Sequence, residues 1–177
     1  MPGPPGRFVG LPMASYPAAV SYAITFVRSE PGMTASQTLE WLNASYDADA
    51  RPVTRSFDPG ELAVWGRIVE VVTRTVGPAS SAVFQRHVEL AWDSPRIRLE
   101  YSGDTAHLTV PYWYRGETGR DVMRTVFAVG RIVESEAGFE GIDEQTGMGL
   151  TEEGLACACR QYDETSARAS ELSSDGI

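Results

Sequence analysis

The chain has 177 residues, of which 24 are acidic, 15 are basic and two are cysteines. This length suits one domain with its own core, and no apolar run reaches the roughly 20 residues that a membrane-spanning helix needs. The formal net charge of −9 argues against binding to nucleic acid backbones, which requires a basic surface. We therefore expect a cytoplasmic protein that binds neither membranes nor nucleic acids.

The negative charge is concentrated in the last quarter of the chain. Residues 1–133 contain 13 acidic and 13 basic residues, whereas residues 134–177 contain 11 acidic residues and two arginines, Arg160 and Arg168. Two interpretations stay open for this part of the chain. It is either a solubilising tail or a segment that docks onto a basic partner protein.

The first residues are expected to lie outside the folded domain. Residues 1–19 contain five prolines and three glycines, and such a stretch cannot form a helix or the interior of a strand. We expect a disordered leader there, with the natural start at Met1, Met13 or Val20, and a single domain over residues 20–150.

The acidic segment 151–177 is expected to be only partly folded. Apolar residues recur at helical spacing as far as Tyr162, which predicts a short helix. The polar, acidic sequence from Ser166 onwards predicts disorder.

Alternation and helix-capping patterns predict an α+β domain with a mostly antiparallel sheet and helices packed on one face. Capping boxes, in which a polar side chain is followed three residues later by Gln, Glu or Asp, open at Thr34, Asp58 and Thr118 and predict the starts of three helices. The element order is β-α-α-β-β-β-α-β, over residues 20–27, 34–46, 58–76, 82–85, 96–101, 107–114, 118–138 and 139–143.

The register of one hairpin follows from its sequence. Gly103-Asp104 is a two-residue turn with glycine first, so Leu99 lies opposite Leu108 and Glu100 opposite His107. A slip of one residue would move every apolar side chain to the wrong face. The other, open face then carries the remaining side chains Arg96, Arg98, Glu100, His107, Thr109 and Trp113.

The aromatic run that ends this hairpin is the best candidate for a binding surface. Pro111 cannot donate to a ladder, so either this strand is an edge strand or its donor side points outward at that position. An edge strand could accept a partner strand or form a homo-oligomer. Tyr112 and Tyr114 share the apolar face and are expected beneath the third helix, whereas Trp113 is expected to be exposed. The candidate binding residues are Trp113, Arg115, Arg96, Arg98 and His107.

A metal site is the main chemical alternative. His87 and Glu89 lie two residues apart in an extended segment, and His107 could join them on a neighbouring strand, giving the two histidines and one carboxylate typical of non-heme iron. We expect no metal bound by His87, Glu89 and His107, and no cofactor, because Glu100 lies opposite His107 across the hairpin and already provides a partner for its side chain. Cys157 and Cys159 lack the spacing of zinc and redox motifs and are expected to be reduced thiols.

Recognised catalytic motifs are absent from the sequence. There is no lysine for a phosphate-binding loop, no Gly-x-Ser-x-Gly turn and no His-Glu-x-x-His. The sequence therefore favours a protein without enzymatic activity.

Three stretches, over residues 21–28, 109–116 and 130–134, resemble a set of small uncharacterised proteins from high-GC actinobacteria. The resemblance covers residues 21 to about 145. It implies no activity, ligand or site residue.

Two functional hypotheses of different class follow. The first is a non-catalytic protein-interaction module, such as an immunity or antitoxin-like protein or an accessory subunit, with a protein partner that is basic. The second is a small enzyme or ligand-binding protein that uses the open face with His87, Glu89 and His107.

Overall fold

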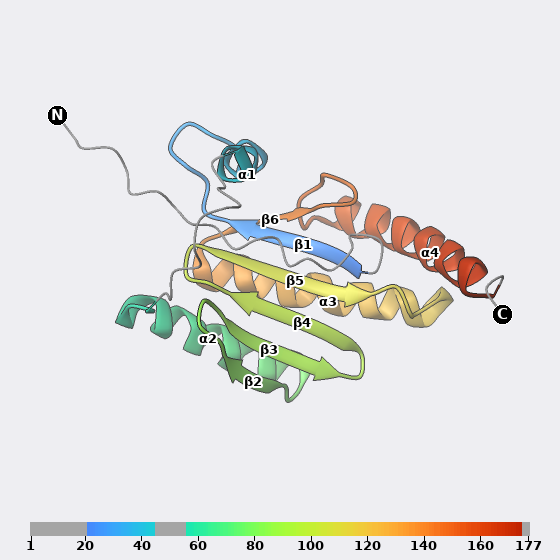
Figure 1. The fold of residues 1–177 in the computed structure, drawn as a ribbon, viewed down its shortest axis with the longest axis horizontal. Helices are drawn as coiled ribbons and strands as arrows, with labels where there is room; N and C mark the ends of the chain where they lie inside the picture. The colour runs from blue at the N-terminus through green and yellow to red at the C-terminus, as the bar shows by residue number, and fades with distance from the viewer. Residues whose placement is uncertain (1–20, 45–55, 175–177) are drawn as a thin grey trace.

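The computed structural model describes residues 21–44 and 56–174, with the side chains described as far as residue 170. Its elements form one sheet with helices packed against it (Figure 1). They are β1 (Ser21–Val27), α1 (Ala35–Ala44), α2 (Pro59–Val76), β2 (Ser80–Val83), β3 (Val88–Asp93), β4 (Arg96–Tyr101), β5 (Thr105–Pro111), α3 (Gly116–Ala137), β6 (Glu140–Asp143) and α4 (Glu152–Ser174). Over these described ranges, no helix has both the length and the apolar character that crossing a bilayer requires.

The sheet has six strands in the order β2-β3-β4-β5-β1-β6, and every neighbouring pair is antiparallel. The predicted fold class is confirmed. The element order omitted β3, whose residues alternate between buried and half-buried positions up to the exposed Asp93. In the sequence, however, Ala91 places a small apolar residue at one of the half-buried positions, so the alternation of apolar and polar residues is short.

The predicted hairpin register is confirmed residue by residue. Leu99 pairs with Leu108, Glu100 with His107 and Arg98 with Thr109. Gly103 adopts a φ of 91°, a left-handed conformation that favours glycine, and closes the turn.

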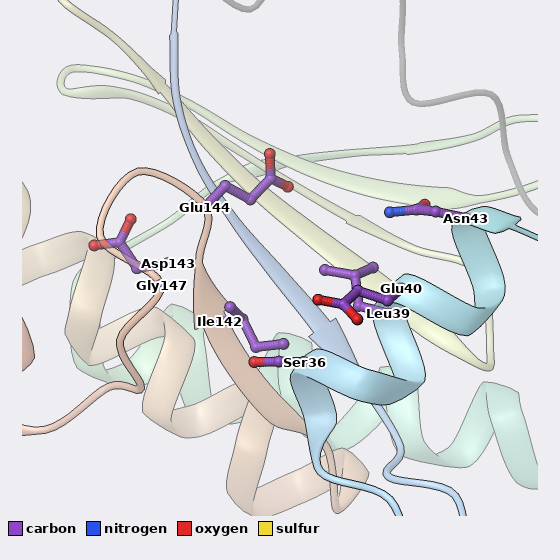
Figure 2. Close-up of a pocket in the computed structure, with 8 residues that line it drawn as sticks. All are labelled: Ser36, Leu39, Glu40, Asn43, Ile142, Asp143, Glu144 and Gly147. Carbon is purple, nitrogen blue, oxygen red and sulfur yellow. The ribbon is translucent and has the colours of Figure 1, made fainter.

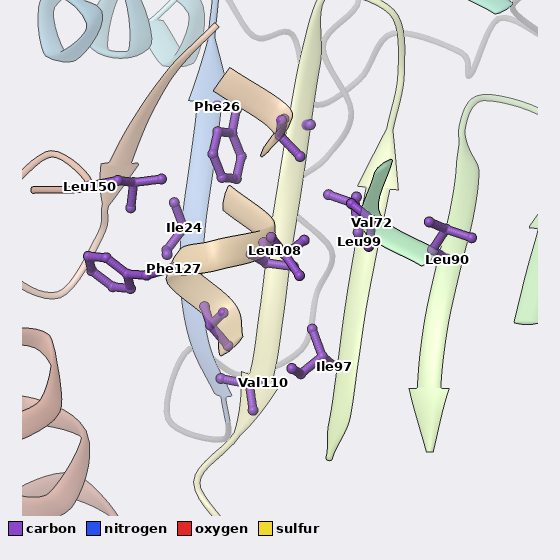
Figure 3. Close-up of a cluster of buried hydrophobic side chains, with 14 of the residues drawn as sticks. Ile24, Phe26, Val72, Leu90, Ile97, Leu99, Leu108, Val110, Phe127 and Leu150 are labelled. Atoms are coloured by element: carbon purple, nitrogen blue, oxygen red, sulfur yellow. The ribbon is translucent and has the colours of Figure 1, made fainter. Parts of the chain in front are cut away.

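The main core lies between the sheet and the helices α2 and α3 (Figure 3). Apolar side chains on one face of the strands contact the buried apolar side chains of α3. The helix α2 contributes Trp65, Ile68 and Val72 to the same core. Sheet residues that are essentially inaccessible to solvent include Ile24, Phe26, Leu90, Ile97, Leu99, Leu108 and Val110.

The helix α1 packs on the other face of the sheet from α2 and α3. Its residue Ala35 packs with Val27 and Ile142, and Leu39 and Leu42 contact the same cluster. Val27 and Ile142 project from the face opposite Ile24 and Phe26, because side chains alternate along a strand. The open face is therefore covered by α1 near β1 and β6.

Two of the three predicted capping boxes are present. Thr34 and Gln37 bond reciprocally at the start of α1, and Asp58 and Glu61 do so at the start of α2. The box predicted at Thr118 is wrong, because α3 begins two residues earlier, at Gly116. The N–H of Gly116 donates instead to a carboxylate oxygen of Asp163 in α4, 3.1 Å away.

The expectation of a short helix followed by disorder from Ser166 is also wrong. The helix α4 continues to Ser174 and packs against α3. Its residues Ala158 and Tyr162 are buried in the main core, and the Ser166 hydroxyl is buried against the backbone that follows β5. The helix α4 therefore belongs to the folded domain.

The strand β5 is not an edge strand, so the first of the two expectations from Pro111 is wrong. It lies between β4 and β1, and Pro111 pairs with Ser21 at the very end of the ladder, where a missing donor costs little. The edges of the sheet are β2 and β6. Pairing with another chain through β5 would thus require one of its neighbours to leave.

Candidate functional site on the open face of the sheet

Polar side chains form a continuous row across the open face, which is the face opposite α2 and α3. Glu89 of β3 lies directly opposite Glu100 of β4, Glu100 lies opposite His107 of β5, and His107 lies opposite Thr25 of β1. We call these four residues the polar row. The row exists because the antiparallel registers place one polar residue of each strand at the same level.

A hydrogen-bond chain orients His107 within the polar row. Thr25, which is buried, donates its hydroxyl proton to Glu144 and lies 3.1 Å from Nδ1 of His107. The Thr25 oxygen is thereby left to accept the Nδ1–H, so the network assigns the proton of the neutral ring to Nδ1 and leaves Nε2 as an acceptor. Burial lowers the pKa of His107, and the opposing effects of Glu144 and Glu100 are smaller.

The structure brings His87, Glu89 and Glu100 together, where the sequence grouped His87, Glu89 and His107. One ligand atom from each of the three lies within 4.8 Å of those of the other two, and all three residues are half-buried. His107 is not part of this group, although it is close enough for His87 to lower its pKa. Glu100 was missed as a candidate because the sequence indicated it only as a partner for His107.

Two neighbouring residues shape this three-residue cluster. The Phe84 ring stacks on the His87 imidazole, with 4.6 Å between ring centroids, and the Phe84 N–H donates to the His87 carbonyl at 2.9 Å. Arg98 forms an ion pair with Glu89, with 3.2 Å between Nε and the carboxylate oxygen. The cluster is thus built on the β2–β3 turn and on two adjacent strands.

Trp113 lies at the opposite end of the open face. Its side chain is 61% exposed, and the Arg96 guanidinium lies over the indole at 5.4 Å from the ring centroid. Arg115, two residues further on, is also exposed. We call Trp113, Arg96 and Arg115 the Trp113 corner.

The helix α4 lies beside the Trp113 corner. The Ser166 hydroxyl is 3.1 Å from the carbonyl oxygen of Tyr112 and 2.8 Å from that of Tyr114, the two residues that flank Trp113. Tyr162, also in α4, donates to the carbonyl of Pro111. Figure 1 shows the end of β5, the start of α3 and the C-terminal part of α4 on the same side of the molecule.

Tyr112 and Tyr114 lie on the helix-covered side of the sheet, as predicted, and the helix residue that the Tyr112 ring contacts is Tyr162 of α4. Tyr112 is buried and its ring contacts those of Tyr22 and Tyr162. Tyr114 is half-buried, and its hydroxyl accepts the Arg96 N–H at 2.7 Å. Tyr114 therefore holds the start of β4, and with it Arg96, next to Trp113.

A buried carboxylate on the other face has a structural explanation. Asp143 is fully buried and accepts hydrogen bonds from the Tyr22 hydroxyl, from the Thr146 hydroxyl and from the N–H of Gln145. Burial, and then the bond to Asp143, raise the pKa of Tyr22. These bonds hold the turn after β6, so Asp143 needs no ligand to compensate its burial.

A shallow depression of about 260 Å³ lies between α1 and the end of β6 (Figure 2). Leu39 and Ile142 provide apolar surface, and the acidic residues Glu40 and Glu144 stand at its rim. Binding sites for drug-sized molecules usually enclose roughly 300–1,000 Å³. The depression is therefore a weaker candidate than the polar row or the Trp113 corner.

The chain matches no model of a known protein family, no curated protein and no solved structure with which it was compared. The residues of the open face are therefore themselves the basis for assigning a function.

Proposed function

We propose that the protein is a non-catalytic interaction module that binds a partner protein through the Trp113 corner and the adjoining surface of α4. One observation supports this most directly: Ser166 of α4 bonds to both residues that flank the exposed Trp113. The two features that the sequence suggested separately, an exposed aromatic residue and an acidic segment, thus share one surface.

The composition of the Trp113 corner fits a contact of high affinity. Tryptophan and arginine are the residues most enriched among those that dominate binding energies. The stacking of Arg96 on Trp113 holds both side chains in place before binding, which reduces the entropy that association costs.

The chemistry of α4 suggests the partner. Its side chains as far as residue 170 include four acidic residues, Glu152, Glu153, Asp163 and Glu164, against Arg160 and Arg168. A partner with a pocket for an indole ring and a basic rim would match this surface. An immunity or antitoxin-like protein that blocks a basic toxin, or an accessory subunit of a larger assembly, would work in this way.

The experiment combines capture of a partner with binding kinetics on matched variants. Trp113→Ala should raise the dissociation rate about thirtyfold, which corresponds to about 2 kcal/mol. The matched control is Leu62→Ala, which removes an exposed apolar side chain from α2. Because α2 packs on the face of the sheet opposite the open face, this change should leave the binding kinetics unchanged.

Charge is tested separately from the aromatic contact. Glu153 and Glu164 are exposed on α4, and changing both to Gln should lower the association rate at low salt but have little effect at high salt. If a captured protein binds the Trp113 and Leu62 variants equally well, the interaction does not use this surface and the proposal fails.

A further inference from the structure

We propose that His87, Glu89 and Glu100 bind a divalent transition-metal ion, with Zn²⁺ as the best match. The inference is independent of the proposed partner surface, because the three-residue cluster and the Trp113 corner lie at opposite ends of β4. It also differs from the set that the sequence indicated, since Glu100 takes the place of His107.

The first argument is the position of the two carboxylates. Glu89 and Glu100 are directly opposite each other on adjacent strands and are both half-buried. Like charges in this arrangement repel each other and destabilise the sheet. Arg98 neutralises Glu89 at 3.2 Å, but within residues 21–44 and 56–174 the Glu100 carboxylate makes no hydrogen bond or ion pair.

The second argument is the state of the His87 ring. Stacking on Phe84 holds the imidazole beside the two carboxylates, yet neither ring nitrogen has a hydrogen-bond partner in the described part of the chain. A half-buried imidazole and a half-buried carboxylate that face each other without such partners are suited to share a cation.

The third argument is geometric. Ligand atoms that sit about 2.1 Å from a tetrahedral zinc ion are separated by about 3.4 Å. The three ligand atoms here lie within 4.8 Å of one another, so small side-chain rotations would bring them to coordinating distance. Arg98 can remain on the second oxygen of Glu89 and orient that carboxylate, as outer partners commonly do in metal sites.

The ligand set also selects the ion. An imidazole nitrogen favours zinc and other first-row transition ions, whereas Mg²⁺ and Ca²⁺ prefer sites made of oxygen ligands alone. Three protein ligands leave a fourth position on zinc for water.

The test is calorimetric titration of the full chain with Zn²⁺ after removal of any affinity tag and of bound metal. The titration uses a background in which Cys157 and Cys159 are changed to Ser, because thiols also bind zinc. We expect one ion per chain and no competition from Mg²⁺. Glu100→Gln, which keeps the shape of the side chain, should weaken binding at least about tenfold.

Three control variants make the result specific. Asp93→Asn removes an exposed carboxylate from the far end of β3 and should not affect the affinity for Zn²⁺. Trp113→Ala should also bind Zn²⁺ normally. His87→Asn provides a second ligand variant, and circular dichroism establishes that each protein is folded.

Two results would overturn the proposal. One is the absence of stoichiometric Zn²⁺ binding to the folded cysteine-free chain. The other is binding that persists unchanged in both Glu100→Gln and His87→Asn, which would place the ion elsewhere.

Discussion

At the scale of single residues, Glu134 should make stability depend on pH. Its carboxylate is half-buried on α3 and accepts the N–H of Gly141 at 2.8 Å. Burial raises the pKa of Glu134, an effect that Glu140 reinforces and that Gly141 and Arg131 partly offset. A carboxyl group whose pKa is raised by folding stabilises the protein below its ordinary pKa, and this contribution is lost as the pH rises through the folded value.

Replacing Glu134 with Gln should therefore stabilise the protein at pH 7. The Gln oxygen can still accept the Gly141 N–H, but no charge has to be desolvated. The difference in unfolding free energy between this variant and the wild type, measured with urea, should shrink as the pH falls through the ordinary glutamate pKa of about 4.3, below which the Glu134 side chain becomes neutral in the unfolded chain as well. Glu40→Gln removes an exposed carboxylate from α1 and is the control. A variant less stable than the wild type at pH 7 would contradict the prediction.

The hairpin register predicts a large cost for truncating Leu108. The side chain is inaccessible to solvent and lies between Ile24 and Leu99 on the neighbouring strands. Leu108→Ala should lower the unfolding free energy by about 2–5 kcal/mol, as for other buried leucines. Thr109→Ala, one residue away on the open face, should cost less than about 1 kcal/mol. Equal effects of the two changes in chemical denaturation would mean that the strand does not present Leu108 to the core.

At the scale of elements, the Ser166 hydroxyl joins α4 to the segment after β5, beside the bond from Tyr162 to Pro111. Ser166 is buried and bonds to the carbonyls of Tyr112 and Tyr114. Ser166→Ala should destabilise the fold by about 1–3 kcal/mol, because buried carbonyl groups lose a partner. Ser135→Ala, at an exposed position of α3, should be neutral or slightly stabilising, since alanine is the better helix former. Thermal unfolding of both variants distinguishes this contact from a general effect of removing serine.

The start of α3 illustrates how one element depends on another. A capping box at Thr118 would have been a local solution, but the helix begins at Gly116, where Asp163 of α4 accepts the first N–H. Asp121, the residue expected to complete the box, instead forms an ion pair with Arg124 at the next turn. Long-range capping of this kind leaves no pattern in the local sequence.

At the scale of the whole molecule, the acidic helix α4 is part of the folded unit. Leu150, Ala158 and Tyr162 are buried in the main core, so a chain that ends at Gly149 exposes the surfaces that these residues cover. We expect such a chain to lose cooperative unfolding, as measured by circular dichroism and tryptophan fluorescence during denaturation. A chain that ends at Ser174 is the control and should unfold like the full protein. A truncated chain that kept a cooperative transition would show that the part of the chain up to Gly149 folds without α4.

The sequence by itself determined what depends on short-range rules. The β4–β5 register follows from the alternation of apolar residues around Gly103-Asp104, because only one register buries all of them. The caps at Thr34 and Asp58 involve partners three residues away. The exposure of Trp113 follows from strand alternation, because its neighbours in the sequence point to the opposite face of the sheet.

The tertiary structure alone decided what depends on residues far apart in the chain. The position of β5 in the middle of the sheet results from pairing with β1, about 85 residues earlier. The length of α4 results from burial of Tyr162 and Ser166 against the segment after β5. The candidate site changed for a different reason: β3 and β4 form a tight hairpin in which Asp93 pairs with Arg96, and the predicted element order lacked β3, so the prediction grouped His107 rather than Glu100 with His87 and Glu89.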